Sequence, residues 1–243
     1  MGSGLQDIRI PEDGDKPNKR ALVVAAHPDD SEFGCAGTTA LWVRDGWEVY
    51  YLICSDGSKG SDRPDVDPKD LIPVRREEQR AAAAVLGVKD VFFLDYVDGE
   101  LTYSRELTRD VVRAIRTLRP HTVFTSDPNQ IVRDMFINHP DHRCVGTVAI
   151  DCVYPLARNR PTFPELLDEG LEPHSAKELL LWSSSQVNHK VDISEVLDLK
   201  LEALRKHESQ FAEMEMPLEQ IKNFWKEDDG RYIENFRRIP IPF

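Results

Sequence analysis

Residues 20–32 read RALVVAAHPDDSE, an apolar run that leads directly into a histidine, a proline and two adjacent aspartates. A short apolar run such as 21–26 is typical of a buried parallel strand. The polar residues that follow it have two interpretations. Proline is favoured at the first position of a helix and aspartate in its first turn, so they can be a capped helix start. Alternatively, their side chains provide half of the ligands of a metal site.

Strand-like and helix-like segments alternate along the first 150 residues. Apolar strands are expected at 21–26, 48–54, 90–94 and 121–126, with helices at 35–46, 74–88, 104–119 and from His139 to about Val153. This alternation predicts a Rossmann-like three-layer α/β/α fold with a mostly parallel sheet. In such sheets the strand order commonly runs 3-2-1-4, and ligands bind at the carboxyl ends of the strands where the order reverses. We therefore expect the site at that edge.

The rest of the chain predicts one main domain with two appendages. We expect a polar N-terminal arm over residues 1–20, the domain over 21–215 and a C-terminal tail over 216–243. Within the domain, strands are expected at 178–184 and 188–193, and one helix at 194–213 with Ser194 as its N-cap. Because the tail carries Trp225, Tyr232 and Phe236, we expect it to pack on the body or on a neighbouring subunit, and we predict a homo-oligomer.

The composition disfavours several classes of protein. Of the 243 residues, 31 are Lys or Arg and 43 are Asp or Glu, so the formal net charge is −12. Nucleic acids and anionic membranes are bound by basic surfaces, so neither is expected as a partner. The four cysteines form no C-x-x-C pair, and no segment is apolar over the length that a membrane span needs. These features predict a cytoplasmic protein without a disulfide framework.

A second motif follows the fourth expected strand, where residues 138–143 read NHPDHR. Each H-P-D tripeptide alone is explained as well by helix capping as by chemistry. Capping does not require histidine, however, and the two loops are predicted to converge at the same edge of the sheet. The pair therefore predicts a functional site.

The residue types in the two motifs match a catalytic zinc site, which takes three protein ligands and keeps one position for water. His27 and Asp30 lie in one short loop stiffened by Pro28, and His142 supplies a third ligand from the second loop. Asp29 is then free to act as general base on the water. The remaining roles are a general acid or oxyanion-stabilising group for His139 and an orienting carboxylate for Asp141. Ferrous iron accepts the same ligand set, so it is the alternative metal.

The sequence resembles the PIG-L/LmbE-type N-deacetylase family. The resemblance rests on AHPDDSEFGCAGT and NHPDHR, with supporting matches in RREEQRAAAAVLG and ALRKHESQF, and it covers residues 20 to about 211. It implies zinc-dependent removal of an acetyl group from an N-acetylglucosamine derivative. It also implies the same ligands and base as above, and a substrate contact by Arg75 (with Arg76 as the alternative) and by Asp98. Ile137 stands where the mycothiol-pathway members of the family carry a tyrosine.

Several functions remain open at this point. The leading one is deacetylation of a small amino-sugar substrate, and an amidase for a thiol–sugar conjugate is closely related to it. A phosphoesterase with two metal ions would need more ligands than the two motifs supply. A sugar-binding protein without catalysis is a further alternative, because a fold does not determine function. His207, near the end of the expected helix 194–213, is more typical of a packed, hydrogen-bonded histidine than of a catalytic one.

Overall fold

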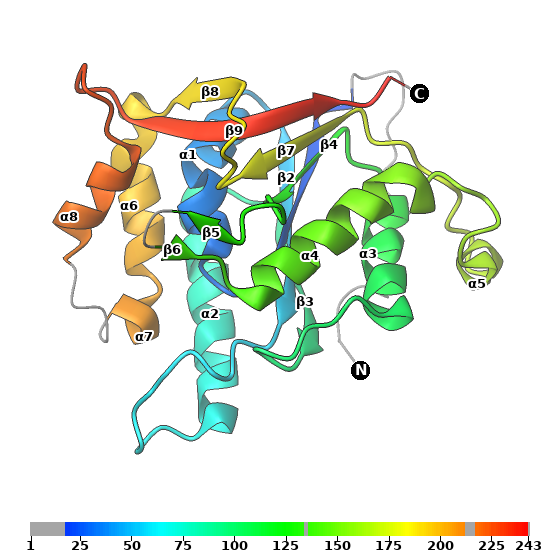
Figure 1. Cartoon of the computed structure of the whole chain (residues 1–243), viewed down its shortest axis with the longest axis horizontal. Helices are drawn as coiled ribbons and strands as arrows, with labels where there is room; N and C mark the ends of the chain where they lie inside the picture. Colours follow the sequence, from blue (N-terminus) through cyan, green and yellow to red (C-terminus); the bar gives the residue numbers. More distant parts are fainter. Residues whose placement is uncertain (1–17, 134–135, 212–216, 243) are drawn as a thin grey trace.

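Strand β1 (Arg20–Ala25), formed by the apolar run, lies inside a seven-stranded sheet (Figure 1). The computed structural model describes residues 18–133, 136–211 and 217–242. The strand order is β3-β2-β1-β4-β7-β9-β8. Neighbours from β3 to β7 run parallel, whereas β9 runs antiparallel to both β7 and β8. The bounds of the other strands are β2 Glu48–Ser55, β3 Asp90–Tyr96, β4 Thr122–Ser126, β7 Glu178–Trp182, β8 His189–Asp192 and β9 Ile233–Pro240.

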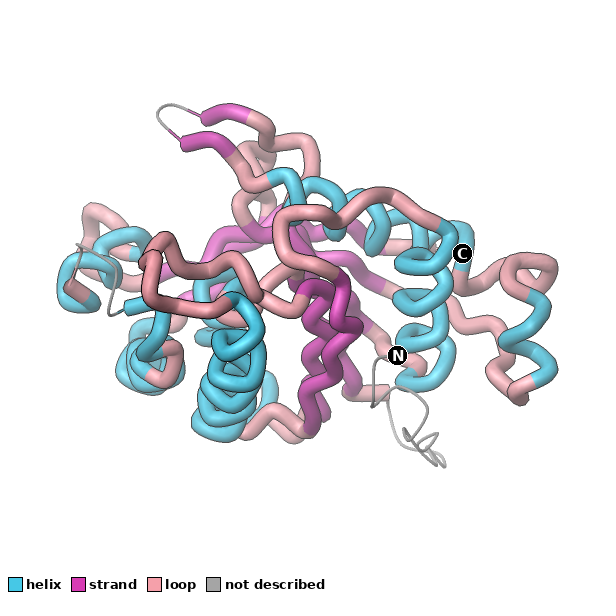
Figure 2. Tube along the Cα trace, turned by 90° about the horizontal axis from the view of Figure 1, so that it is seen from below, coloured by secondary structure: helices cyan, strands magenta, loops and turns pink. Residues whose placement is uncertain are grey.

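Helices cover both faces of the sheet, as Figure 2 shows from a second direction. Successive side chains of β1 point to opposite faces, so Ala21 and Val23 pack in one core and Leu22 and Val24 in the other. The first core includes apolar residues from α1 (Asp30–Arg44), α2 (Pro68–Leu86) and α6 (Leu197–Arg205). The second includes residues from α3 (Arg105–Leu118) and α4 (Pro140–Asp151). The three-layer prediction is therefore confirmed, including the order 3-2-1-4 of the first four long strands.

The remaining elements are short. A two-stranded ribbon of β5 and β6 precedes α4, and a π-helical turn, η1, follows it. Two 3₁₀ turns, η2 and η3, and three helices of four or five residues complete the described chain. Their bounds are β5 Val132–Arg133, β6 Phe136–Ile137, η1 Cys152–Leu156, α5 Pro164–Asp168, η2 Ser194–Val196, α7 Glu208–Phe211, α8 Leu218–Ile221 and η3 Lys222–Trp225.

Some expected helix bounds differ from the structure. Helix α2 begins at Pro68, because Asp67 accepts a hydrogen bond from the Lys69 amide and the proline occupies the first turn. The single helix expected at 194–213 is divided into η2, α6 and α7. The Ser194 hydroxyl does not cap a helix, because it donates to Asp192 and accepts from the backbone amide of Tyr232.

The C-terminal segment belongs to the main sheet, since β9 lies between β7 and β8. The sheet therefore does not end at residue 215, and the segment packs on the body of its own chain. Phe236 is fully buried against Phe124, and Trp225 lies over the Lys200 ammonium at 3.9 Å. These aromatic side chains pack inside their own chain and therefore give no support to the predicted homo-oligomer. The homo-oligomer stays a prediction. The predicted arm lies outside the described residues, except for 18–20.

The segments after β1 and β4 are brought together by close packing of α4 on β4. A Cβ atom on Gly146 would lie 2.4 Å from the carbonyl oxygen of Ser126, so only glycine allows this approach. The Ser126 hydroxyl also donates to the carbonyl of His142 at 2.7 Å. Helix α4 is thereby fixed at the carboxyl end of β4, which places the second motif beside the first.

Two further predictions concern disulfide bonds and membrane spans. Cys35, Cys54, Cys144 and Cys152 are all unpaired thiols, as expected. Within the described ranges, no helix combines the length and the apolar character needed to cross a bilayer. The cytoplasmic location stays a prediction.

Candidate metal centre

Three side chains from the two motifs converge at the carboxyl ends of β1 and β4. The Nδ1 atom of His27 lies 3.2 Å from Nε2 of His142. Oδ1 of Asp30 lies 3.0 Å from the same His142 atom, and Oδ2 of Asp30 lies 3.7 Å from Nδ1 of His27. Tetrahedral ligands at about 2.0–2.1 Å from a zinc ion lie about 3.3 Å from one another. The spacing and chemistry of these three groups therefore fit a zinc ion.

Each histidine of the centre is oriented through its second ring nitrogen. Nε2 of His27 lies 3.1 Å from Asp98 and 3.2 Å from Asp141. Nδ1 of His142 lies 3.1 Å from the side-chain oxygen of Asn138, which is consistent with an Nδ1–H donor. Carboxylate and amide oxygens behind the histidines of a metal site usually determine the tautomer and the ring orientation. Here they direct Nδ1 of His27 and Nε2 of His142 toward the common centre.

The two carboxylates behind His27 are themselves held by backbone amides. Asp141 is fully buried and accepts hydrogen bonds from the amides of Gly99 and Leu101 at 2.7 and 3.3 Å. The second oxygen of Asp98 accepts from the amide of Lys59 at 3.0 Å. The loops after β2 and β3 therefore support the His27 side of the centre.

The charges of the centre favour a bound cation. Burial alone would lower the pKa of His27, but the carboxylates of Asp141, Asp30 and Asp98 raise it well above its usual value. Burial alone would raise the pKa of Asp30, but His142 and His27 lower it well below its usual range. An ionised carboxylate between two such histidines is an environment for positive charge, carried by protons or by a metal ion.

Asp29 differs from its neighbour because its backbone is left-handed, with φ 93° and ψ −27°. Helix α2 holds it at two points. Arg75 donates to the Asp29 carboxylate at 3.2 Å and to the carbonyl of Pro28 at 2.7 Å, and Gln79 accepts from the Asp29 amide at 2.9 Å. Arg75 and Gln79 are four residues apart, so they lie on one face of the helix. Burial raises the pKa of Asp29, with Arg75 opposing the effect and Asp30 adding to it.

A buried polar network continues from Gln79 away from the centre. The Gln79 amide nitrogen donates to both oxygens of Glu32 at 3.0 and 3.1 Å, and Nε2 of His207 lies 3.2 Å from Glu32. All three side chains are fully buried. Ser209 then donates its amide and its hydroxyl to Glu78 on α2, both at 2.7 Å. This position agrees with the predicted structural role of His207, since His207 contacts Glu32, and Glu32 accepts from the Gln79 side chain that bonds the Asp29 amide.

His139 occupies the N-cap of α4, and its Nδ1 atom accepts a hydrogen bond from the amide of Asp141 at 3.2 Å. Burial lowers the pKa of His139, and the neighbouring His27 and His142 lower it further. A neutral imidazole that accepts through Nδ1 carries its proton on Nε2, so the ring offers one N–H donor. Its ring centroid lies 4.8 Å from that of His27, at the rim of the centre.

Two alternative ligand groups occur among the described residues. One joins His27 and His142 with His139, and the other joins His27 with Asp98 and Asp141. In the first, the Nδ1 atom of His139 is already used by a backbone amide. In the second, both carboxylates lie at Nε2 of His27, the nitrogen that does not face His142, and backbone amides donate to them as they do to Oδ2 of Asp30. The set of His27, Asp30 and His142 leaves all of these contacts in place.

The structure also places the two residues predicted to contact substrate. Arg75 is 3% exposed and Asp98 is 5% exposed, and both are bonded to protein groups. Their contact with substrate stays a prediction. Sequence reasoning did not identify Gln79, Glu32 or Asn138. The only local signal for Gln79 was its spacing of four residues from Arg75 on the predicted helix.

Comparison with known proteins gives consistent matches across nearly the whole chain. Residues 22–153 match the family described as PIG-L, GlcNAc-PI de-N-acetylase. The diacetylchitobiose deacetylase of Thermococcus kodakarensis is 37% identical over 229 residues, which cover 91% of this chain and 84% of that protein. A probable N-acetyl-α-D-glucosaminyl L-malate deacetylase 2 of Bacillus anthracis is 28% identical, covering 93% and 95%.

The solved structures include a similar protein. The N,N′-diacetylchitobiose deacetylase of Pyrococcus horikoshii superposes with a TM-score of 0.83 at 34% identity, covering 97% of this chain and 88% of that one. The agreement extends through β9, because the match covers almost the full described chain. The fold and the sequence thus lead to the same group of proteins.

Proposed function

The chain belongs to the PIG-L family of de-N-acetylases, and from this premise we propose that it removes the acetyl group from an N-acetylated amino sugar by metal-dependent hydrolysis. The observation that carries the proposal is the arrangement of His27, Asp30 and His142 around one point with the Asp29 carboxylate beside it. Two nitrogens and a carboxylate oxygen at this spacing are the ligand set of a hydrolytic metal site.

We propose zinc as the metal. The donor set accepts zinc or ferrous iron, and amide hydrolysis transfers no electrons, so the redox chemistry of iron is not required. When bound, zinc would polarise the amide carbonyl and lower the pKa of a coordinated water to about 7. Asp98, Asp141 and Asn138 would keep the histidine nitrogens turned toward it.

The remaining chemistry is assigned to residues of the chain. Asp29 would take one proton from the attacking water, whose oxygen forms the new bond to the acetyl carbon. The Nε2–H of His139 would donate a hydrogen bond to the former carbonyl oxygen as negative charge develops there. The C–N bond then breaks, the proton held by Asp29 passes to the departing amine nitrogen, and the acetyl group leaves as acetic acid, which gives its remaining proton to solvent and becomes acetate. Arg75 and Gln79 hold Asp29 in place for both transfers.

The substrate class follows from the relatives. Those described above are named for diacetylchitobiose and for N-acetylglucosaminyl malate, which share an N-acetylglucosamine unit. We propose the disaccharide of N-acetylglucosamine as the first candidate, because the more similar of these relatives, at 34% and 37% identity, are named for it.

The geometry does not favour a phosphoesterase with two metal ions. A second ion at Asp98 and Asp141 would share His27 with the first, so the ring would have to bind metals through both nitrogens. That requires the ring to lose both protons, and it would replace the contacts of Nε2 with Asp98 and Asp141 by a bond to the second metal.

The test is acetate release from a panel of N-acetylglucosamine derivatives, measured with enzyme loaded with zinc or with iron. Asp29→Ala is expected to abolish turnover with metal content near one ion per chain, whereas His142→Ala is expected to lose the metal. Glu77→Gln on the exposed face of α2 is the matched control, since the Glu77 side chain is 74% exposed and pairs with Arg80 at the surface. Near-full activity of Asp29→Ala would refute the assignment of the base.

A further inference from the structure

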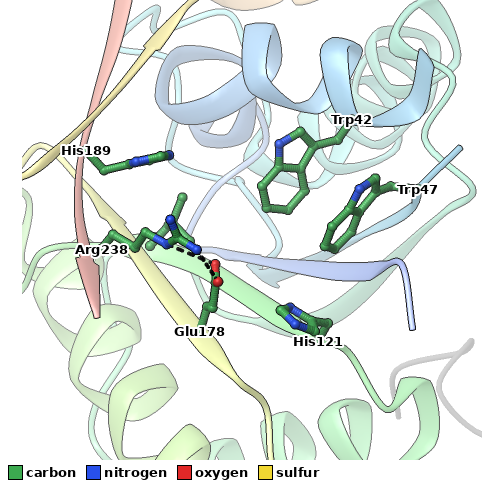
Figure 3. A pocket seen from close by; sticks show the side chains of 7 residues that line it. Trp42, Trp47, His121, Glu178, His189 and Arg238 are labelled. Atoms are coloured by element: carbon green, nitrogen blue, oxygen red, sulfur yellow. Dashed lines mark hydrogen bonds and ion pairs between the residues drawn. The ribbon is translucent and has the colours of Figure 1, made fainter. Parts of the chain in front are cut away.

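A second cavity lies on the face of the sheet covered by α1, at the edge opposite the metal centre (Figure 3). Its volume is about 250 Å³. It opens where β4 and β7 begin, whereas the metal centre lies where β1 and β4 end. Its lining comes from α1, the turn after it, the residue before β4, and the strands β7, β8 and β9: Trp42, Trp47, His121, Glu178, Leu180, His189 and Arg238.

One wall of the cavity is aromatic. The rings of Trp42 and Trp47 are 4.3 Å apart between centroids and inclined by 31°, and His121 meets the edge of Trp47 at 5.7 Å. Phe124 of β4 supports Trp42 from behind at 5.0 Å. Both indoles are only partly buried. Their positions are therefore fixed by packing while part of each ring remains open to a ligand.

The opposite wall is polar and carries little net charge. Arg238 and Glu178 form a two-point ion pair, in which the guanidinium Nε donates to one carboxylate oxygen at 3.2 Å and Nη2 to the other. Figure 3 shows this pair and His189 facing the two indoles across the cavity. Burial lowers the pKa of His189, and Arg238 lowers it further, which favours the neutral ring. An ionic ligand would have to compete with the internal pair.

A ligand that matches both walls is neutral, has an apolar face and carries hydrogen-bonding groups on its edge. A pyranose ring has this form, because its axial C–H bonds make one face apolar and its hydroxyls lie around the rim. Indole rings supply a rigid apolar surface for that face, and charged groups make the stronger hydrogen bonds to hydroxyls. We propose that this cavity is a second saccharide-binding site, in which a sugar ring packs against the paired indoles of Trp42 and Trp47 and bonds to Glu178 and Arg238.

The second site is separate from the reaction. Strand β4 has His121 before its first residue and Ser126 as its last, and at about 3.3 Å per residue these two ends of the strand are about 17 Å apart, with the cavity at one end and the metal centre at the other. A ring bound there contacts neither the metal ligands nor Asp29. The site would act as an anchor that holds a saccharide on the protein without reacting. Its ligand class rests on the proposed function, since it assumes that the protein works on sugars.

The test is a calorimetric titration of the full-length Asp29→Asn variant, chosen to prevent turnover, with the disaccharide of N-acetylglucosamine. Two binding events per chain are expected. Adding Trp47→Ala should remove one of them, and Phe224→Ala, which removes another exposed aromatic ring, should leave both. Glu178→Gln should weaken the same event about tenfold, and it serves as the second variant if the tryptophan replacement does not fold.

The outcomes separate this inference from the proposed function. A single event that Trp47→Ala abolishes supports the second site and counts against the proposed substrate at the metal centre. A single event that Trp47→Ala leaves intact refutes the second site, as do two events that both survive it. Sedimentation of Trp47→Ala should show an unchanged mass. A lower mass without loss of sugar binding would identify the cavity as a contact between subunits and overturn the inference.

Discussion

Replacing Gln79 by methionine tests whether the position of Asp29 depends on helix α2. Methionine keeps the length and volume of the side chain but removes the amide. The Asp29 amide loses its acceptor at 2.9 Å, and Glu32 loses a donor that reaches both of its oxygens. Gln79 and Glu32 are fully buried, so no solvent replaces these hydrogen bonds unless the structure opens.

The expected losses follow from those bonds. A buried N–H group left without a partner costs about 1–3 kcal/mol, and a hydrogen bond to a charged group contributes about 1.5–3 kcal/mol. Unfolding should therefore become easier by about 3–5 kcal/mol. The left-handed conformation of Asp29 is itself unfavourable by about 1–2 kcal/mol. Without the hydrogen bond to Gln79, Asp29 should leave this conformation. A resulting increase of about 1.4–2.8 kcal/mol in the activation free energy lowers kcat by about 10- to 100-fold.

The assay combines urea unfolding, steady-state kinetics and metal analysis. We expect KM and metal content to change little, because Gln79 contacts neither substrate nor a proposed ligand. Gln79→Glu separates the effect on stability from the effect on kcat. It keeps an acceptor for the Asp29 amide but sets a carboxylate against Glu32, so stability should fall as much while kcat falls less. Equal kcat in Gln79→Met and the parent enzyme would refute the reasoning, and loss of metal together with kcat would attribute the effect to the ligands instead.

Three further predictions concern the support of the centre and the response to acid. Asp98→Asn should weaken metal binding about 10- to 100-fold in a chelator competition, since it removes a carboxylate from behind His27, and unchanged affinity would contradict that role. Gly146→Ala should lower the free energy of unfolding by about 1–3 kcal/mol in urea, because the new Cβ would lie 2.4 Å from the Ser126 carbonyl oxygen, and an unaltered midpoint would show that α4 can move. Burial lowers the pKa of His174 to about 4, below its unfolded value of 6.5, so its contribution to stability is full above about pH 6.5 and is lost as the pH falls toward 4. Between pH 7 and pH 5 this loss is about 2 kcal/mol, and His174→Gln should lose that much less than the parent protein.

The parallel part of the fold was predictable because its signals are local. The runs that became β1, β2 and β4 are apolar on both faces, and the helices between them carry glycine or proline at their ends. Strand β9 was not predicted, because its sequence IENFRRIP carries three charged side chains and ends in proline. Its position depends on pairing with β7 and β8, which lie more than forty residues earlier in the chain. Such pairing has no local pattern.

In the candidate site, too, some residues could be predicted from local sequence and others could not. His27, Asp30 and His142 were identified because each follows a strand whose end lies at the switch point, so position and residue type together indicate a site. Glu32 and His207 contact each other across 175 residues of sequence, and nothing near either residue indicates the other. Arg75 and Asp98 were expected to face the substrate. In the structure both contact protein groups, Arg75 the carbonyl of Pro28 and Asp98 the ring of His27, and their contact with substrate stays a prediction.

The backbone of Asp29 connects the proposed metal ligands with the buried network of Gln79, Glu32 and His207. Glycine is the residue that adopts a φ of 93° at least cost, and an aspartate there keeps the turn under strain. The strain turns Asp29 away from Asp30, so that one carboxylate faces His142 and the other faces Arg75. A glycine at this position would relax the turn and remove the proposed base. The buried bonds from Gln79 to Glu32 and from Glu32 to His207 offset the strain, so the C-terminal part of the chain, which supplies His207, supports the proposed base without touching it.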